Sequence, residues 1–201
     1  MYLQRHGESK TNVEKLFTCR KLDPGLTVAG RKQMEERAVF YLHVGIQEII
    51  TSPSLRAVQS AEILGEACGL SINTDNALLE VDLGELEGKS QSDTESLRIF
   101  FNTLDEWLQG NADIRFPGGE SGKDVEDRIK AVLTFSSSKT LLVGHATFFA
   151  MLMGNTGMRY KKAEELFLPR AGAAHYTKET EMWKMIGRAE PADSSDAWQH
   201  D

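Results

Sequence analysis

Short apolar segments alternate with longer amphipathic segments along most of the chain, and this alternation most restricts its possible folds. The apolar segments, which have the composition of buried strands, are Met1–Leu3, Ile46–Thr51, Leu70–Thr74 and Thr140–Val143. The segments between them, whose apolar residues recur at helical spacing, are Arg31–Leu42, Leu55–Ala67, Thr94–Leu108, Asp124–Phe135 and Thr147–Asn155. Strands that alternate with helices predict an α/β fold, a three-layer αβα sandwich around a mostly parallel central sheet.

Residues that favour helix ends bound several of these segments. Thr27 and Ser121 suit N-caps, because a hydroxyl oxygen accepts a hydrogen bond from a backbone N–H of the first turn. Ser52-Pro53-Ser54 is expected to turn the chain and cap the helix that begins at Leu55. Gly45 and Gly69 suit helix C-termini, because glycine adopts the left-handed conformation there.

Near the C-terminus, two segments expected to be strands follow one another without a helical segment between them. Ala174–Lys178 and Met182–Ile186 are expected to pair as a hairpin or to lie at a sheet edge. Residues 1–188 are predicted to form a single domain, and the polar, acidic residues 189–201 are predicted to form a flexible tail.

Composition narrows the classes of partner. The 201 residues carry a net charge of −7, which argues against a general nucleic-acid binder but not against a small anionic substrate in a locally basic pocket. No apolar run has membrane-spanning length, so no membrane association is expected. Cys19 and Cys68 have no metal-ligand spacing, and two distant free thiols favour a cytoplasmic protein. The sequence leaves the oligomeric state open.

Charged residues follow two of the predicted strands. Arg5-His6-Gly7 ends the first strand, Gly144-His145 ends the strand at Thr140–Val143, and Arg56 lies in the first turn of a helix. Gly7 is expected to let the backbone bend and a ligand approach closely. Because parallel strands bring their carboxyl ends to one edge, two guanidinium groups and two imidazoles are expected to form one cup, which would suit a phosphoryl group.

Together these residues resemble the histidine phosphatase superfamily, branch 1, also called the phosphoglycerate mutase-like family. The resemblance covers Leu3 to about Ala150 and rests on several motifs in the family's order. They are Leu3-Gln4-Arg5-His6-Gly7-Glu8-Ser9 with Asn12, Leu26-Thr27 through Gly30, Ser52-Pro53-Ser54-Leu55-Arg56 through Ala61, Leu79-Glu80 with Gly84 and Glu87-Gly88, Pro117-Gly118-Gly119-Glu120-Ser121, and Val143-Gly144-His145-Ala146.

The resemblance implies a role for each site residue. His6 would be the nucleophile that becomes a phosphohistidine, and Arg5, Arg56 and His145 would hold the phosphoryl oxygens. Glu80 would be the general acid and base, although Asp82, Glu85 and Glu87 lie in the same loop. The residues expected to contact the substrate are Asn12, Thr18, Cys19, Gly144 and Ala146. Cys19 departs from the family's frequent Thr-Gly and is expected to narrow the rim. No metal and no cofactor are implied, since the arginines supply positive charge.

The resemblance favours a phosphatase that hydrolyses a phosphomonoester over two alternatives. A cofactor-dependent phosphoglycerate mutase would need extra basic residues, whereas Lys89–Glu120 contains no adjacent arginine pair. A non-catalytic phosphate-binding module would be expected to lose the nucleophile or the acid. The substrate would be a small phosphorylated metabolite, with a phosphoprotein left open.

Other aromatic and histidine residues are assigned to packing or to the surface. Aromatic residues expected to belong to a core or lid helix rather than to a substrate site are Phe100, Phe101 and Trp107. Histidines expected to be surface or structural residues are His43, His175 and His200.

Overall fold

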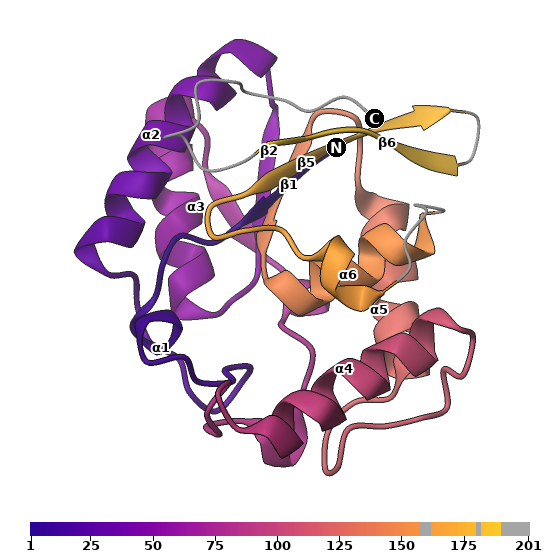
Figure 1. Cartoon of the computed structure of the whole chain (residues 1–201). Helices are drawn as coiled ribbons and strands as arrows, with labels where there is room; N and C mark the ends of the chain where they lie inside the picture. The colour runs from indigo at the N-terminus through magenta and orange to yellow at the C-terminus, as the bar shows by residue number, and fades with distance from the viewer. Residues whose placement is uncertain (157–161, 180–181, 190–201) are drawn as a thin grey trace.

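A six-stranded sheet forms the centre of the computed structural model, which describes residues 1–156, 162–179 and 182–189 (Figure 1). The strands are β1 Tyr2–Arg5, β2 Glu48–Thr51, β3 Ile72–Thr74, β4 Thr140–Gly144, β5 Ala173–Glu179 and β6 Met182–Ala189. Their order is β3-β2-β4-β1-β5-β6, and the first four are parallel. β5 is antiparallel to β1 and to β6, so the predicted terminal hairpin is confirmed.

Helices cover both faces of the sheet, which confirms the predicted αβα sandwich. They are α1 Lys10–Val13, α2 Val28–Val44, α3 Leu55–Cys68, α4 Thr94–Leu108, α5 Gly122–Phe135 and α6 Ala146–Asn155, with short 3₁₀ turns at Asn76–Leu78, Gly84–Leu86 and Ala163–Leu166. In Figure 1, α2 and α3 lie on one side of the sheet and α5 and α6 on the other, with α4 below α5 and α6.

Most helix ends follow the predicted local chemistry. The Thr27 hydroxyl accepts a hydrogen bond from the Gly30 N–H at 2.9 Å, and Ser121 forms a capping box with Asp124. Gly45 and Gly69 end α2 and α3 with φ values of 68° and 67°, in the left-handed region.

The N-terminus of α3 is capped in an unexpected way. The Ser54 side chain makes no cap hydrogen bond to the described first turn of α3. Instead, the Leu55 N–H donates to both carboxylate oxygens of Asp23, at 2.8 and 3.0 Å. Because this cap comes from a residue 32 positions away, local sequence does not reveal it. Asp23 thereby fixes an irregular loop against the helix that carries Arg56.

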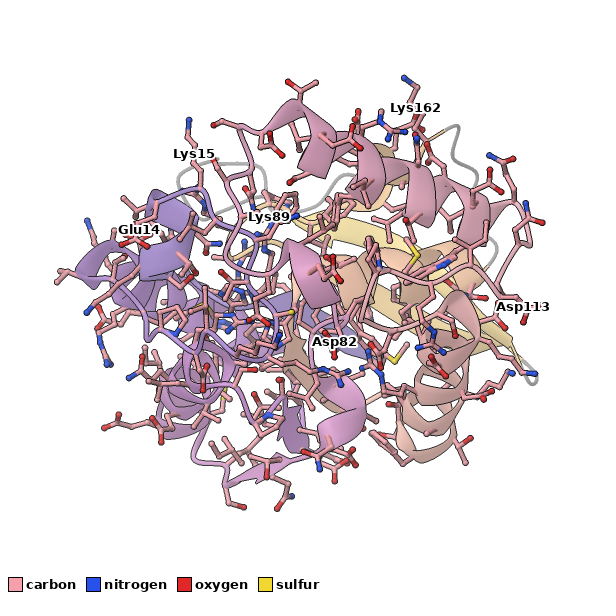
Figure 2. The ribbon with its side chains drawn as sticks, turned by 90° about the horizontal axis from the view of Figure 1, so that it is seen from below. Glu14, Lys15, Asp82, Lys89, Asp113 and Lys162 are labelled. Carbon is pink, nitrogen blue, oxygen red and sulfur yellow. The ribbon has the colours of Figure 1, made fainter. Side chains whose placement is uncertain are left out.

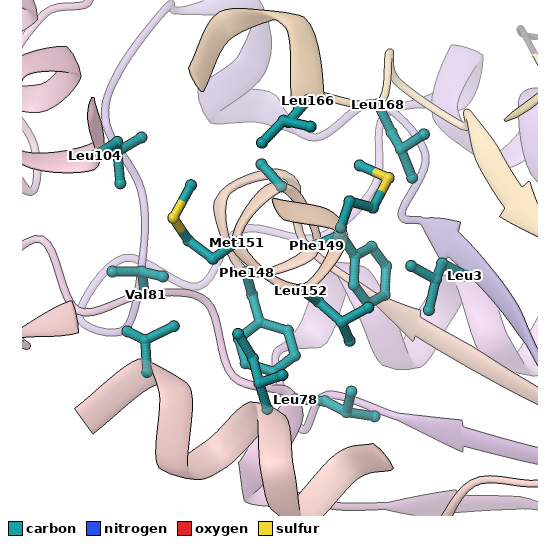
Figure 3. Packing of buried hydrophobic residues seen from close by; sticks show 14 of the residues in the cluster. Leu3, Leu78, Val81, Leu104, Phe148, Phe149, Met151, Leu152, Leu166 and Leu168 are labelled. Atoms are coloured by element: carbon teal, nitrogen blue, oxygen red, sulfur yellow. The ribbon is translucent and has the colours of Figure 1, made fainter. Parts of the chain in front are cut away.

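Successive strand residues pack on opposite faces of the sheet. Tyr2 and Leu141 belong to the cluster under α2 and α3, whereas Leu3 and Leu142 belong to the larger cluster under α4, α5 and α6. Figure 3 shows the larger cluster around α6, with side chains from several segments that are distant in the sequence. Those labelled are Leu3, Leu78, Val81, Leu104, Phe148, Phe149, Met151, Leu152, Leu166 and Leu168.

The predicted tail falls largely outside the described residues. β6 extends through Ala189, which pairs with Ala173, so the first residue assigned to the tail lies in the sheet. Residues 190–201, including His200, are not described. Among the residues that are described, no helix has both the length and the apolar character needed to cross a bilayer.

Candidate active site

Two parallel strands bring the two predicted site histidines together. β1 and β4 pair in a register that places Arg5 opposite Gly144. The next residue continues this pairing, because the His6 N–H donates to the Gly144 carbonyl at 3.0 Å. The ring centroids of His6 and His145 are 5.3 Å apart. The predicted proximity of His6 and His145 therefore follows from the register in which β1 and β4 pair.

Backbone contacts fix the proton position on His6. Its Nδ1 lies 2.7 Å from the Gly7 carbonyl oxygen, which can only accept a hydrogen bond. In the neutral ring, Nδ1 therefore carries the proton and Nε2 carries the free electron pair. Burial, followed by the positive charges of Arg56 and Arg5, lowers the pKa of His6 well below its usual value. His6 is thus a neutral imidazole with Nε2 available.

His145 is fully buried beside His6. Its Nε2 lies 2.8 Å from the Ser52 hydroxyl oxygen, and its Nδ1 has no hydrogen-bond partner among the described residues. Burial, followed by the charges of Arg56, His6 and Arg5, lowers the pKa of His145 well below its usual value. Ser52 follows β2, so a third strand end orients the second imidazole.

Two guanidinium groups flank the imidazoles. Arg56 is only 2% exposed, and it donates to the Cys19 carbonyl at 3.3 Å and approaches Asp23 at 3.5 Å. Arg5 donates to the Leu168 carbonyl at 2.6 Å, while its buried Nε has no partner in the described structure. Burial lowers the pKa of Arg5 to about 10, so both groups stay cationic at neutral pH. A cation with a buried donor that has no partner, such as Arg5 Nε, favours an anionic ligand.

Glu80 is held at the start of α6. Its Oε1 accepts hydrogen bonds from the N–H groups of Val81 and Phe148, and its Oε2 accepts one from Thr147. A carboxylate has about four acceptor positions, so one position on Oε2 is left for a proton. Behind this loop, Arg128 donates to the Leu79 carbonyl at 2.7 Å. Glu80 thus presents one oxygen position to the site from a fixed carboxylate.

One cavity of about 220 Å³ joins most of the predicted residues. Those that line it are Arg5, His6, Asn12, Thr18, Arg56, Glu80 and Ala146. His145, Cys19 and Gly144 are not among the described residues of its wall. The His145 ring packs edge-on against His6, and Gly144 is occupied in strand pairing and packs on the Phe149 ring.

Cys19 and Gly7 serve the surrounding packing instead of the rim. The Cys19 side chain is buried and its thiol donates to Glu87 Oε2 at 3.0 Å, so the structure does not show the expected narrowing. A Cβ on Gly7 would lie 2.4 Å from the Gly30 carbonyl oxygen, in α2. The space that glycine provides at position 7 is therefore used by a helix, whereas ligand access was expected.

Glu87, one of the rival acids, organises the loop beside Arg56. Its Oε1 accepts the backbone N–H groups of Cys19, Lys21 and Leu22 at 3.1, 2.7 and 2.8 Å. Burial opposes its charge, yet the hydrogen bonds from the Cys19 thiol and the backbone hold the pKa of Glu87 below its usual value. Glu87 thus orients the Cys19 carbonyl that binds Arg56, a role that sequence reasoning missed.

The remaining wall of the cavity corrects the expectation for two aromatic residues. Phe100 and Phe101 belong to α4 and pack with the core, but they also line the cavity. Trp107 is buried and its indole N–H donates to the Ile114 carbonyl, as expected for a packing residue. Sequence periodicity identifies the apolar face of α4 but does not show that part of it borders a pocket.

Other residues near the site are structural or lie elsewhere. Arg170 pairs with Glu8 at 2.7 Å and donates to the Asn12 carbonyl, which ties the residues after β1 to the segment before β5. His175 stacks on Tyr2 with ring centroids 4.0 Å apart, and His43 contacts the Val39 carbonyl within α2. In the part of the chain that is described, no three histidine, cysteine or acidic residues gather to hold a metal.

The combination of this sheet, these strand-end imidazoles and these buried guanidinium groups defines the class of protein. The family profile of the histidine phosphatase superfamily (branch 1) matches residues 1–187. The chain belongs to this superfamily, which confirms the resemblance found in its motifs.

Individual relatives carry different names. The probable phosphoglycerate mutase GpmB of Salmonella paratyphi B is 36% identical over 160 residues, covering 76% of this chain and 72% of that protein. The structure of YhfR from Bacillus stearothermophilus superimposes with a TM-score of 0.73 at 25% identity, covering 92% and 93% of the two chains. Mycobacterial glucosyl-3-phosphoglycerate phosphatase Rv2419c, solved with VO3, gives a TM-score of 0.73 at 23% identity, covering 92% and 96%.

Proposed function

We propose that the protein is a metal-independent phosphatase that hydrolyses small phosphomonoesters through a phosphohistidine on His6. One observation carries the proposal: His6, a neutral imidazole whose Nε2 has a free electron pair, lines a cavity that is also lined by Arg5 and by the buried Arg56. A nucleophile and cations around one small cavity suit transfer of a group whose charge spreads over several oxygens. The names of the mutase and phosphatase relatives agree with phosphoryl transfer.

In the first step, His6 Nε2 attacks phosphorus and the bond from phosphorus to the ester oxygen breaks. Glu80 Oε2 gives its proton to the departing alkoxide. Arg5 and Arg56 neutralise charge on the phosphoryl oxygens as it develops. The buried His145, which Ser52 orients and whose Nδ1 has no partner among the described residues, is proposed to help hold the same group.

In the second step, water attacks phosphorus and the bond from phosphorus to His6 Nε2 breaks. Glu80, now a carboxylate, takes the proton from this water and returns to its starting state. Inorganic phosphate leaves, and His6 regains its free electron pair. Asn12 and Thr18, which border the cavity, are proposed to contact the phosphoryl group or the substrate.

A phosphoglycerate mutase is the second candidate, favoured by the 36% identity to GpmB. A mutase returns the phosphoryl group to a substrate hydroxyl, so it must bind the carboxylate of phosphoglycerate as well as the phosphate. The described cations that line the cavity, Arg5 and Arg56, both lie beside His6. Since these cations are needed for the phosphoryl group, the described cavity wall has no further cation for the carboxylate, which favours hydrolysis over mutase activity.

Rapid quenching tests the proposal. The enzyme is mixed with an excess of p-nitrophenyl phosphate and quenched in base during turnover. Phosphate that is stable to base and labile to acid should be found on a peptide that contains His6. Phosphate of this kind on another residue would refute the assignment, and a parallel assay for interconversion of phosphoglycerates would detect a mutase.

A further inference from the structure

The cavity has two ends of different chemistry. Arg5, His6, Arg56 and Glu80 form the end at which the phosphoryl group is proposed to bind. Apolar side chains form most of the remaining described wall. They are Leu16, Phe17, Leu83, Leu97, Phe100, Phe101 and Phe167. The part of a substrate beyond the ester oxygen would therefore meet mainly carbon atoms.

Aromatic rings from three segments form a continuous surface at this second end. Phe100 of α4 lies with its ring centroid 5.1 Å from that of Phe17 and 5.1 Å from that of Phe101. Phe167 closes the group at 6.0 Å from Phe100 and 6.4 Å from Phe101. These separations lie in the range of favourable aromatic pairs, about 4.5–7 Å. Phe17, Phe100, Phe101 and Phe167 are called the aromatic wall below.

Backbone hydrogen bonds hold the Phe17 side of the aromatic wall in place. The Phe17 N–H donates to the Lys89 carbonyl at 2.9 Å, and the Phe17 carbonyl accepts the Gly88 N–H at 2.8 Å. The Gln91 N–H donates to the Lys15 carbonyl at 2.7 Å, which joins the same two segments again. Figure 2 labels Lys15 and Lys89 on these paired segments. This side of the wall is therefore formed before a substrate binds.

The polar groups at this end have little to offer an anion. Gln91 reaches the cavity, but one N–H of its neutral side-chain amide already donates to the Leu16 carbonyl at 3.1 Å, so a single uncharged donor remains. The described lysine and arginine residues of the cavity lining are Arg5 and Arg56 alone, and both are already assigned to the phosphoryl group. A carboxylate placed here would lose water without gaining a cationic partner, which costs free energy. An apolar ring placed here would instead bury carbon surface against carbon surface.

We infer that the preferred substrates are phosphate esters of small aromatic or similarly flat apolar alcohols, in preference to phosphoglycerates and sugar phosphates. This inference rests on the proposed phosphatase activity and specifies the alcohol that the phosphatase releases. The aromatic wall selects the alcohol, whereas Arg5 and Arg56 bind the phosphoryl group common to all substrates.

The test compares 2-phenylethyl phosphate with 3-phosphoglycerate. Both are esters of primary alcohols, so their ester bonds are similarly difficult to cleave. A difference in rate therefore reports mainly how well each alcohol fits the cavity. Phosphate release is measured for each at several concentrations. We expect kcat/KM for 2-phenylethyl phosphate to exceed that for 3-phosphoglycerate by about tenfold or more, the scale on which pockets distinguish apolar groups.

Variants of one half-buried wall residue locate the selectivity. Phe101→Ala should lower the ratio of the two kcat/KM values several-fold, mainly through a higher KM for the aromatic ester. Phe101→Leu keeps an apolar side chain and should retain most of the ratio. Phe135→Ala removes an equal ring from the end of α5, where Phe135 is 37% exposed and not part of the described cavity wall, and should leave the ratio unchanged.

Each outcome separates this inference from the proposed function. If 3-phosphoglycerate is hydrolysed as well as or better than the aromatic ester, the inference is wrong and the phosphatase assignment stands. An unchanged ratio in folded Phe101→Ala would also overturn it. If neither ester is hydrolysed and His6 takes up no phosphate, the proposed function falls and this inference with it.

Discussion

The phosphate end and the aromatic wall of the same cavity are built in contrasting ways. His6, His145 and Ser52 directly follow central strands, and main-chain hydrogen bonds at 3.0 Å join the ends of those strands. The aromatic wall comes from α4 and from two irregular segments outside the sheet. The comparison indicates that the sheet positions the proposed catalytic groups, whereas the segments added around it would set which alcohol is accepted.

This difference gives each end its own kinetic signature. A change in His6, Arg5 or Arg56 at the phosphate end should slow every ester by a similar factor, because all substrates share the phosphoryl group. The effect of a change in Glu80 should instead depend on the leaving group. A change in the aromatic wall should alter the ratio between substrates and leave the labelling of His6 intact. The following experiments test this division, from the largest expected effect to the smallest.

Removing His6, the proposed nucleophile, should have the largest effect. His6→Ala should reduce kcat for aromatic and aliphatic esters alike by about 10⁴-fold or more, as expected for loss of a covalent nucleophile. It should also abolish phosphate labelling. Steady-state kinetics with both ester classes, together with circular dichroism and thermal melts to show that the fold survives, provide the measurement. Substantial residual turnover of only one ester class would contradict the division of roles between the phosphate end and the aromatic wall.

The loss of activity on removing Glu80, the proposed general acid, should depend on the leaving group. Glu80→Gln should slow 2-phenylethyl phosphate by about 10²–10⁴-fold, because its alkoxide needs a proton as it departs. The loss for p-nitrophenyl phosphate should be much smaller, since its leaving group is stable without one. Equal losses for both esters would remove Glu80 from the acid role.

Glu87 should act as a positioning residue through Arg56. Glu87→Ala releases the backbone N–H groups of Cys19 and Leu22 and should lower kcat/KM by about tenfold for all esters, a typical cost of misplaced catalytic groups. Glu87→Gln keeps an acceptor for those groups and should retain most activity. The neighbouring Glu85→Ala is the control. A purely structural role would lower the melting temperature of Glu87→Ala without changing kcat/KM of the folded enzyme.

The electrostatics of the phosphate end can be followed by titration. Burial and the charges of Arg56 and Arg5 lower the pKa of His6, so its imidazole should stay neutral as pH falls through 6.5. Nitrogen NMR shifts of the ring measure this directly. Arg56→Gln removes a positive charge and should move the His6 pKa upward. A His6 that takes up its proton near pH 6.5 in the unaltered protein would contradict the buried, cationic setting.

Metal removal should have the smallest effect of all. Because Arg5 and Arg56 supply the positive charge at the phosphate end, kcat/KM for either ester should be unchanged in excess EDTA. Activity is assayed before and after dialysis against the chelator. A loss that added Mg²⁺ restores would show that the guanidinium groups alone do not neutralise the transition state.

Local sequence signals were sufficient for most of the fold. Thr94–Leu108 forms a helix with the predicted bounds, since an Asp93 cap and a regular apolar face agree there. Apolar segments bounded by turn residues similarly located β2 and β4 within two residues. The pairing of β1 with β4 then follows from the fold class, and with it the proximity of His6 and His145.

Local sequence signals did not predict contacts between residues that are distant in the sequence. Asp23 caps α3 and Glu87 supports the loop at Cys19, and each contact joins residues more than 30 positions apart. The cavity face of Phe100 and Phe101 depends on where α4 packs, which helical spacing does not specify. The motifs therefore located the groups that would react, but not the groups that hold or surround them.

The hydrogen bond from His6 Nδ1 to the Gly7 carbonyl decides which chemical isomer the covalent intermediate would be. With the proton fixed at Nδ1, phosphorylation is confined to Nε2 and yields the τ-phosphohistidine (3-phosphohistidine) isomer. Isomer-selective antibodies would distinguish it from the π form. Two successive in-line displacements at phosphorus, one onto the ring and one off it, would also return a chiral phosphate with its original handedness.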